Sequence, residues 1–177
     1  MDAVKNRIGM EKRLFEVCLP VVREQGYLLY DLEYLPTQKL LRMYIMDPAT
    51  KSAVIEDCIK VDHALTPVFE QNEWIPEEVV LEVGSPGVYR HISSLSHFEM
   101  GVGEVHEVTI TGNLEAAPKK IAGAKKFRGV LKAAAPAAIT LATSEGDVEI
   151  PLTQIKKAGL DPDFNELMNK AAQAGEE

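Results

Sequence analysis

The sequence predicts an α+β protein of two small domains: an α/β domain with a three-stranded sheet and two helices on one face, followed by a small β-barrel. Three observations support this prediction. Apolar residues of the first half change between helical and strand spacing in the order helix, strand, strand, helix, strand. From residue 101 onward the pattern is one of short strands separated by turns. The length of 177 residues fits two small domains, which we place at residues 1–91 and 92–177.

The composition is that of a folded protein in a reducing compartment. Hydrophobic residues make up 46% and charged residues 26% of the chain, close to the averages of globular proteins. No segment reaches the roughly 18 uncharged apolar residues of a membrane-spanning helix, and the first residues lack the pattern of a signal peptide. Two cysteines do not make a disulfide framework, so we expect a cytoplasmic protein. The net charge of −8, considered alone, argues against a polyanionic partner.

A helix and a hairpin are expected at the start of the first domain. Residues 4–23 carry apolar side chains at helical spacing, and Gly26 suits the C-terminal cap. Residues 27–35 and 39–46 alternate as strands do, and the turn between them is short enough to predict an antiparallel hairpin. The apolar helix positions are Val4, Ile8, Phe15, Cys18 and Val22.

A second helix and a third strand complete the predicted sheet. Residues 55–71 carry an apolar helical face, although Pro67 should kink this helix or end it early. Residues 79–83 form the third strand after Ile75-Pro76. The order of the elements places both helices on one face of the sheet.

The second domain is predicted to be mostly β-structure. A short helix is expected at residues 93–100 and one helical turn at residues 153–158, with a disordered tail from about residue 165. The candidate strands, which together suggest a small barrel, are residues 104–111, 126–133, 138–143 and 147–152.

A basic cluster in the second half is the most informative part of the charge pattern. Residues 119–132 carry a local charge of +6 in 14 residues, whereas residues 1–91 carry −5 and the remainder −3. Each lysine or arginine that contacts a phosphate releases a counterion, so such a cluster can bind RNA despite the global sign. The alternative is a solvated, lysine-rich loop. The candidate RNA- or ribosome-binding residues are Lys119, Lys120, Lys125, Lys126, Arg128 and Lys132.

A turn after the third strand is the second candidate site. Its backbone N–H groups can form an anion-binding concavity, to which a nearby arginine can add a charge. The alternative is an interdomain turn whose glycines relieve backbone strain. The candidate residues for this interdomain or contact loop are Ser85, Pro86, Gly87 and Arg90.

Signals for catalysis or for a metal are weak. The segment around Ser85 is not the G-x-S-x-G of a nucleophile elbow, and no glycine-rich phosphate loop is complete. The four histidines show no metal-ligand spacing with the cysteines, so we expect surface or packing roles for them. Cys18 and Cys58 lie on apolar helix faces and should pack as small hydrophobes. We therefore expect no catalytic residues, no metal, no cofactor and no small-molecule substrate.

Several segments together resemble a known family. They are Leu41-Arg42-Met43-Tyr44-Ile45, Glu56-Asp57-Cys58, Ile75-Pro76-Glu77, Leu81-Glu82-Val83-Gly84-Ser85-Pro86-Gly87 with Arg90, Lys125-Lys126-Phe127-Arg128-Gly129 and Ile155-Lys156-Lys157-Ala158. In this order and spacing they are similar to the bacterial ribosome maturation factor family RimP. Three positions depart from the family pattern: Tyr89 replaces an acid, His91 replaces a proline, and Gly159 replaces a common arginine.

The resemblance implies an α/β domain followed by an SH3-like barrel. It implies a non-enzymatic factor for maturation of the small (30S) ribosomal subunit, which binds the immature subunit through its rRNA and a basic ribosomal protein near the decoding centre. An acidic N-terminal half suits such a protein partner, because opposite charges speed encounter and set orientation.

Two other functions stay open at this point. A general RNA-binding protein that acts in translational control would carry the same basic cluster. A hydrolase that uses Ser85 would need a base and an oxyanion site nearby. His91 lies six residues further on, but no orienting acid is evident in the sequence.

Overall fold

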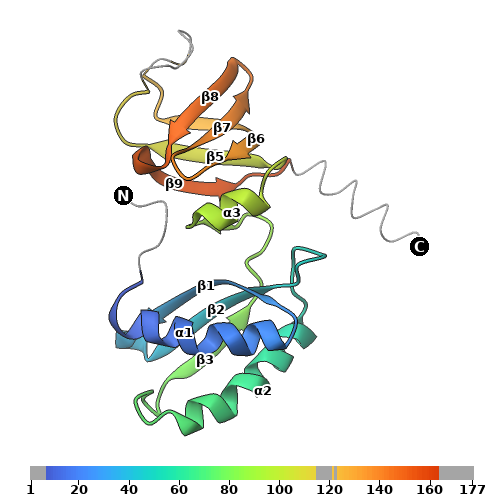
Figure 1. Ribbon diagram of the computed structural model, residues 1–177, viewed down its shortest axis with the longest axis vertical. Helices are drawn as coiled ribbons and strands as arrows, with labels where there is room; N and C mark the ends of the chain where they lie inside the picture. The colour runs from blue at the N-terminus through green and yellow to red at the C-terminus, as the bar shows by residue number, and fades with distance from the viewer. Residues whose placement is uncertain (1–6, 115–120, 122, 164–177) are drawn as a thin grey trace, which may run out of the picture. The chain divides into compact units, whose positions relative to one another are not determined.

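The computed structural model describes residues 7–114, 121 and 123–163. These residues belong to two compact units, Arg7–Gly87 and the chain from Val88 onward. Figure 1 shows the predicted α+β class, with a three-stranded sheet and two helices in the first unit and a separate six-stranded sheet in the second. Lys119, Lys120 and the tail that we expected to be disordered lie outside the described residues.

The first unit is a three-stranded sheet with the order β1-β2-β3. Strands β1 and β2 form the expected antiparallel hairpin, and β3 pairs with β2 in parallel through the α2 crossover. Helices α1 and α2 cover one face of this sheet (Figure 1). The elements are α1 (Gly9–Glu24), β1 (Leu28–Leu35), η1 (Pro36–Gln38), β2 (Leu40–Met46), α2 (Ile55–Gln71) and β3 (Val80–Gly84).

The core of the first unit corrects two details of the sequence prediction. Helix α1 buries Leu14, Cys18 and Val22, while Ile8 precedes the helix and is 75% exposed. The predicted face therefore began too early, and Leu14 replaces Ile8 among the packed positions. Helix α2 continues past Pro67 to Gln71, so that proline does not end the helix early.

A carboxylate fixes the start of α2. The Val54 N–H donates to Asp57 Oδ2 at 2.9 Å, and the Tyr27 hydroxyl donates to Asp57 Oδ1 at 2.5 Å. The hydrogen bond that Tyr27 donates to Asp57 raises the pKa of Tyr27 to about 12, and the same bond lowers the pKa of Asp57. The first turn of α2 is thus tied to the residue that precedes β1.

The second unit is one antiparallel six-stranded sheet with the order β4-β9-β5-β6-β7-β8. Every strand contributes buried side chains to a single core, to which α3 adds Phe98. The sheet therefore wraps one core, but the described strands show no pairing between β4 and β8, so no closed barrel is found. The elements are β4 (His91–Ile92), α3 (Leu95–Met100), β5 (Val105–Ile110), β6 (Lys126–Ala134), β7 (Ala138–Thr143), β8 (Gly146–Pro151), η3 (Leu152–Gln154) and β9 (Ile155–Leu160).

Strand β9 overturns one prediction. Residues 153–158 were expected to form a helical turn, but only the short 3-10 helix η3 precedes a six-residue strand. This strand pairs with β5 on one side and β4 on the other, and it buries Ile155, Ala158 and Leu160. Pairing on both sides outweighs the weak local helix propensity of the segment.

One glycine is required by close packing between two strands. A Cβ atom at Gly129 in β6 would lie 2.3 Å from the carbonyl oxygen of Ala142 in β7. No real side chain tolerates that contact, so the β6–β7 pairing depends on a residue without a Cβ.

Candidate nucleic-acid interface

The predicted basic residues that the structure describes lie on β6 or next to it. Lys126, Arg128 and Lys132 are exposed on the outer face of the strand, while Phe127 and Leu131 between them are buried in the core. This alternation is what places the charges together on one face. Phe127 is 3% exposed, so it is a core residue and offers no stacking surface.

Each of these three cations is paired with an acid of another strand or segment. The Nζ atoms of Lys126 and Lys132 lie 2.8 Å from Glu107 and 2.7 Å from Asp147. Arg128 pairs with the carboxylate of Asp161 and also donates to its backbone carbonyl at 3.1 Å; the hydrogen bond to that carboxylate raises the arginine pKa. The face is therefore one of mixed charge, and a phosphate must compete with these carboxylates for the cations.

Lys125 has a different role from the three cations on β6. Its ammonium group donates to the Gly112 carbonyl and, at 2.5 Å, to Asn113 Oδ1. These bonds join the end of the loop before β6 to its beginning after β5. The structure thus brings Lys125, Lys126, Arg128 and Lys132 to one region, whereas Lys119 and Lys120 lie outside the described residues.

Two lysines that were not among the candidate residues also face solvent. A bulge in β9 opposite Thr109 and Ile110 inserts Lys156, so that Lys156 and Lys157 are both exposed although they are consecutive. No ion pair or hydrogen bond of these two side chains is seen within the described part of the chain. In a regular strand, consecutive side chains point to opposite faces of the sheet. The sequence pattern alone therefore does not predict that Lys156 and Lys157 both face solvent; the bulge explains it.

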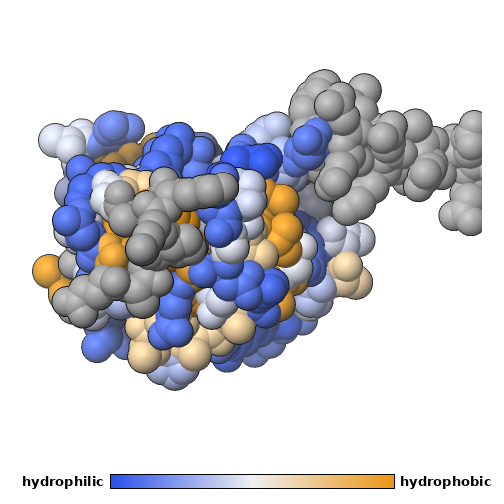
Figure 2. Space-filling view, turned by 90° about the horizontal axis from the view of Figure 1, so that it is seen from above, coloured by the Kyte–Doolittle hydropathy of each residue, from blue (hydrophilic) through white to orange (hydrophobic). Residues whose placement is uncertain are grey.

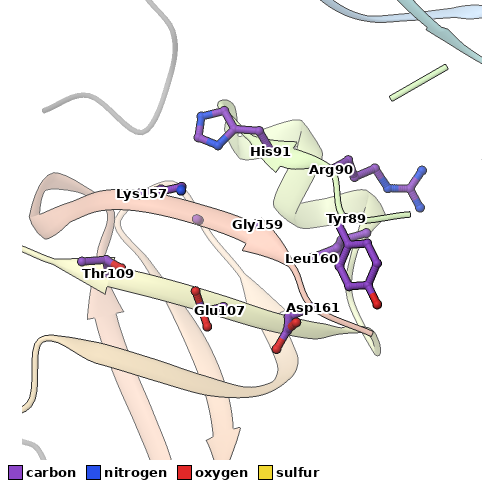
Figure 3. Close-up of a pocket in the computed structure, with 10 residues that line it drawn as sticks. Tyr89, Arg90, His91, Glu107, Thr109, Lys157, Gly159, Leu160 and Asp161 are labelled. Carbon is purple, nitrogen blue, oxygen red and sulfur yellow. The ribbon is translucent and has the colours of Figure 1, made fainter. Parts of the chain in front are cut away.

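The outer face of β5 and β9 carries a pocket of about 360 Å³. Figure 3 shows His91, Lys157 and Thr109 toward one end, Tyr89 and Asp161 toward the other, with Glu107 between them. Lys157 and Asp161 thus lie toward opposite ends of the pocket. The lining residues are Tyr89, Arg90, His91, Glu107, Thr109, Lys157, Ala158, Gly159, Leu160 and Asp161.

The three departures from the family pattern meet in this pocket. Tyr89, His91 and Gly159 all line it, although the first two are about 70 residues away from the third in the sequence. Gly159 faces outward between the buried residues Ala158 and Leu160 and has no side chain to fill the pocket. The hollow therefore exists where this chain differs from the pattern.

Seen from above, the surface of the second unit mixes hydrophilic and hydrophobic residues (Figure 2). Val102 and Val130 of this unit are 45% and 39% exposed. Hydrophobic side chains thus lie among hydrophilic ones on this face.

A comparison with protein families gives one match. A family model described as the RimP N-terminal domain matches residues 17–89. The first unit of the chain is thus similar to the N-terminal domain of the RimP family. The matched RimP domain runs from the middle of α1 through β3 and ends before the basic cluster.

The turn after β3 lies near the end of the matched segment and contains a local hydrogen bond. The Gly87 N–H donates to Ser85 Oγ at 3.4 Å, and Gly87 has a φ of +75°, which favours glycine. Arg90 lies beyond the turn, in the second unit, where its side chain is 12% exposed and its guanidinium lies 3.8 Å from the Glu104 carboxylate. The structure thus gives Ser85 a turn-forming contact and Arg90 an ion pair within its own unit.

The two cysteines lie in apolar surroundings. Cys18 is fully buried, and burial raises its pKa to about 12. Cys58 is half-buried, and burial together with the charge of Asp57 raises its pKa. Neither thiol is a ready thiolate at neutral pH. In the described part of the chain no group of three or more potential metal ligands occurs, and no helix is long and apolar enough to cross a membrane.

Proposed function

We propose that this chain is a non-enzymatic, cytoplasmic assembly factor that binds the immature small ribosomal subunit. The observation that carries the proposal is the match of residues 17–89 to the RimP N-terminal domain. In this function the cations of the second unit contact rRNA phosphates, and the first unit faces a basic ribosomal protein near the decoding centre.

The charges of the two units support this division. Residues 7–87 carry 8 basic and 14 acidic residues, a balance of −6 that favours a basic protein over a nucleic acid. The second unit holds Lys126, Arg128 and Lys132 on one strand and the outward pair Lys156 and Lys157 on another. The curled six-stranded sheet around one core also supports, as part of the proposal, a relation to SH3-like barrels.

Co-sedimentation with purified small subunits tests the proposal. Binding should weaken steeply as the salt concentration rises, because each phosphate contact releases a counterion. Replacement of Lys125, Lys126 and Arg128 together by alanine should weaken binding clearly and reduce the salt dependence. If this variant binds as well as the parent, the proposal that the basic cluster binds RNA is wrong.

A matched control separates a local effect from a change in net charge. Lys12, Lys51 and Arg23 are two lysines and one arginine of the first unit, and their joint replacement by alanine changes the net charge equally. This control should bind nearly as the parent does. Preference for free small subunits over whole ribosomes supports an assembly role, whereas equal binding to both favours a general RNA-binding protein.

A further inference from the structure

A groove of about 240 Å³ lies between α2 and β3 in the first unit. Ile55 and Ile59 are one helical turn apart and are 70% and 49% exposed, which is unusual for large aliphatic side chains. Val83 lines the groove from the side of β3. The remaining lining residues are Cys58, Asp62 and His63.

Strand β3 is an edge of its sheet, with β2 on one side and no strand paired to its other side within the described residues. The Val80 N–H donates to the Lys39 carbonyl at 2.8 Å, so Val80 and every second residue after it direct their backbone groups toward β2. The backbone groups of Leu81 and Val83 therefore point away from β2, toward the open edge of the sheet.

The opposite edge of the sheet is protected. In β1 the Leu32 N–H donates to Asp31 Oδ1 at 2.8 Å, and the Tyr34 N–H donates to Glu11 Oε2 at 3.3 Å. Side-chain carboxylates thus occupy two amides of the β1 edge, which is a common protection against strand pairing. The two edges of one small sheet differ: carboxylates cap β1, whereas a groove lined partly by aliphatic side chains lies beside β3.

The charges around the groove favour a basic occupant. Asp62 lines the groove, Glu56 is exposed next to Ile55, and the unit as a whole carries −6. Lys60, the lysine of α2, donates instead to the Gln25 carbonyl at 2.9 Å and lies over the Tyr27 ring. An extended basic segment is therefore attracted, whereas an acidic one is repelled.

We propose that an extended, basic segment of a partner protein adds as a strand to β3 and places apolar side chains in the groove against Ile55, Ile59 and Val83. An edge strand with a helix beside it provides main-chain hydrogen bonds for affinity and side-chain pockets for selection. The proposal names the contact site for the basic protein partner and in that respect rests on the proposed function.

A synthetic seven-residue peptide that alternates lysine and valine is the probe, used with the full chain and followed by NMR hydrogen exchange. The amides of Leu81 and Val83 should exchange more slowly when the peptide is bound, and those of Leu32 and Tyr34 should be unchanged. A peptide that alternates glutamate and valine should not bind. Protection of neither Leu81 nor Val83, or equal binding of both peptides, would overturn the proposal.

Two isoleucine variants provide matched controls. Ile59→Arg places a positive charge in the groove and should weaken binding of the basic peptide about tenfold or more, which is ~1.4 kcal/mol. Ile8→Arg makes the same change at an exposed isoleucine outside the groove and should bind as the parent does. Equal loss in both variants contradicts the assignment.

The two proposals fail separately. If the chain co-sediments with small subunits but no peptide protects β3, the proposed function stands and the proposal for the groove is wrong. If the chain binds the basic peptide through β3 but does not bind small subunits, the proposal for the groove stands and the proposed function is wrong.

Discussion

At the scale of single residues, His106 is the most constrained polar group of the second unit. It is fully buried, stacks on Phe98 with ring centroids 6.0 Å apart, and its Nδ1 lies 3.0 Å from the Glu104 carbonyl oxygen. Its Nε2 atom has no hydrogen-bond partner within the described residues. The Nδ1–H tautomer of the neutral ring satisfies this geometry, whereas a charged ring would bury an unpaired N–H.

The burial of His106 predicts a pH-dependent stability. Burial lowers the pKa of His106 in the folded state, against a smaller opposite effect of the Glu104 carbonyl. The stability that comes from the neutral ring is present above the unfolded pKa of about 6.5 and is lost as the pH falls through and below that value. Urea unfolding at pH 7, 6 and 5 should show this loss.

The comparison of two histidine variants isolates the contribution of His106. The variant His106→Asn should lose part of the pH dependence whatever its absolute stability, while His63→Gln, at an exposed position, should retain it. The same slope in the parent and in His106→Asn would contradict the assignment.

The cysteines give a second residue-scale prediction. Cys18 is 0% exposed with a pKa of about 12, and Cys58 is half-buried with a raised pKa. In the folded chain a thiol-specific aromatic disulfide should react slowly with Cys58 and should not react with Cys18. In urea both cysteines should react rapidly. In Cys58→Ser the slow phase should vanish, and its persistence would show that Cys18 is accessible.

At the scale of strands, Gly129 provides a test of the β6–β7 contact. Gly129→Ala should lower the free energy of unfolding by about 1–3 kcal/mol or more, because the new Cβ meets the Ala142 carbonyl. Gly84→Ala in β3 is the control, since its Cβ meets nothing within 4 Å, and its effect should stay within ~1 kcal/mol. Thermal unfolding measures both. Similar effects of the two substitutions would mean that β7 moves aside.

The strands also show where sequence reasoning succeeds and where it stops. The alternation of apolar and polar residues predicted β6, β7 and β8 closely, because one face of each strand is buried and carries apolar side chains. The segment of β9 has two consecutive lysines, which hide the alternation, and its pairing with β4 and β5 is a long-range property that no local pattern contains. The ion pairs of Lys126, Arg128 and Lys132 were missed for the same reason.

At the scale of the whole molecule, the paired charges of the second unit predict an unusual gain of function. If Lys126 and Lys132 contact phosphates, then Glu107→Gln with Asp147→Asn frees both cations and should raise the affinity for small-subunit RNA severalfold at low salt. Filter binding over a salt series measures this affinity.

The control for this gain neutralises two other acids of the second unit, Glu145 and Glu149. Glu149→Gln with Glu145→Gln changes the net charge equally, at two exposed positions of the same unit. A gain of the same size in both double variants would assign the effect to net charge alone and not to the freed lysines.

The place of β9 in its sheet has a consequence for synthesis of the chain. This strand lies between β4 and β5, yet among the described strands of the unit it is the last to be translated. Until residue 160 has left the ribosome, β4 has no neighbour in the sheet and the core lacks Ile155, Ala158 and Leu160. The second unit therefore folds only near the end of its own translation, and a nascent chain that stalls before β9 presents an open core to the proteases that remove unfinished proteins.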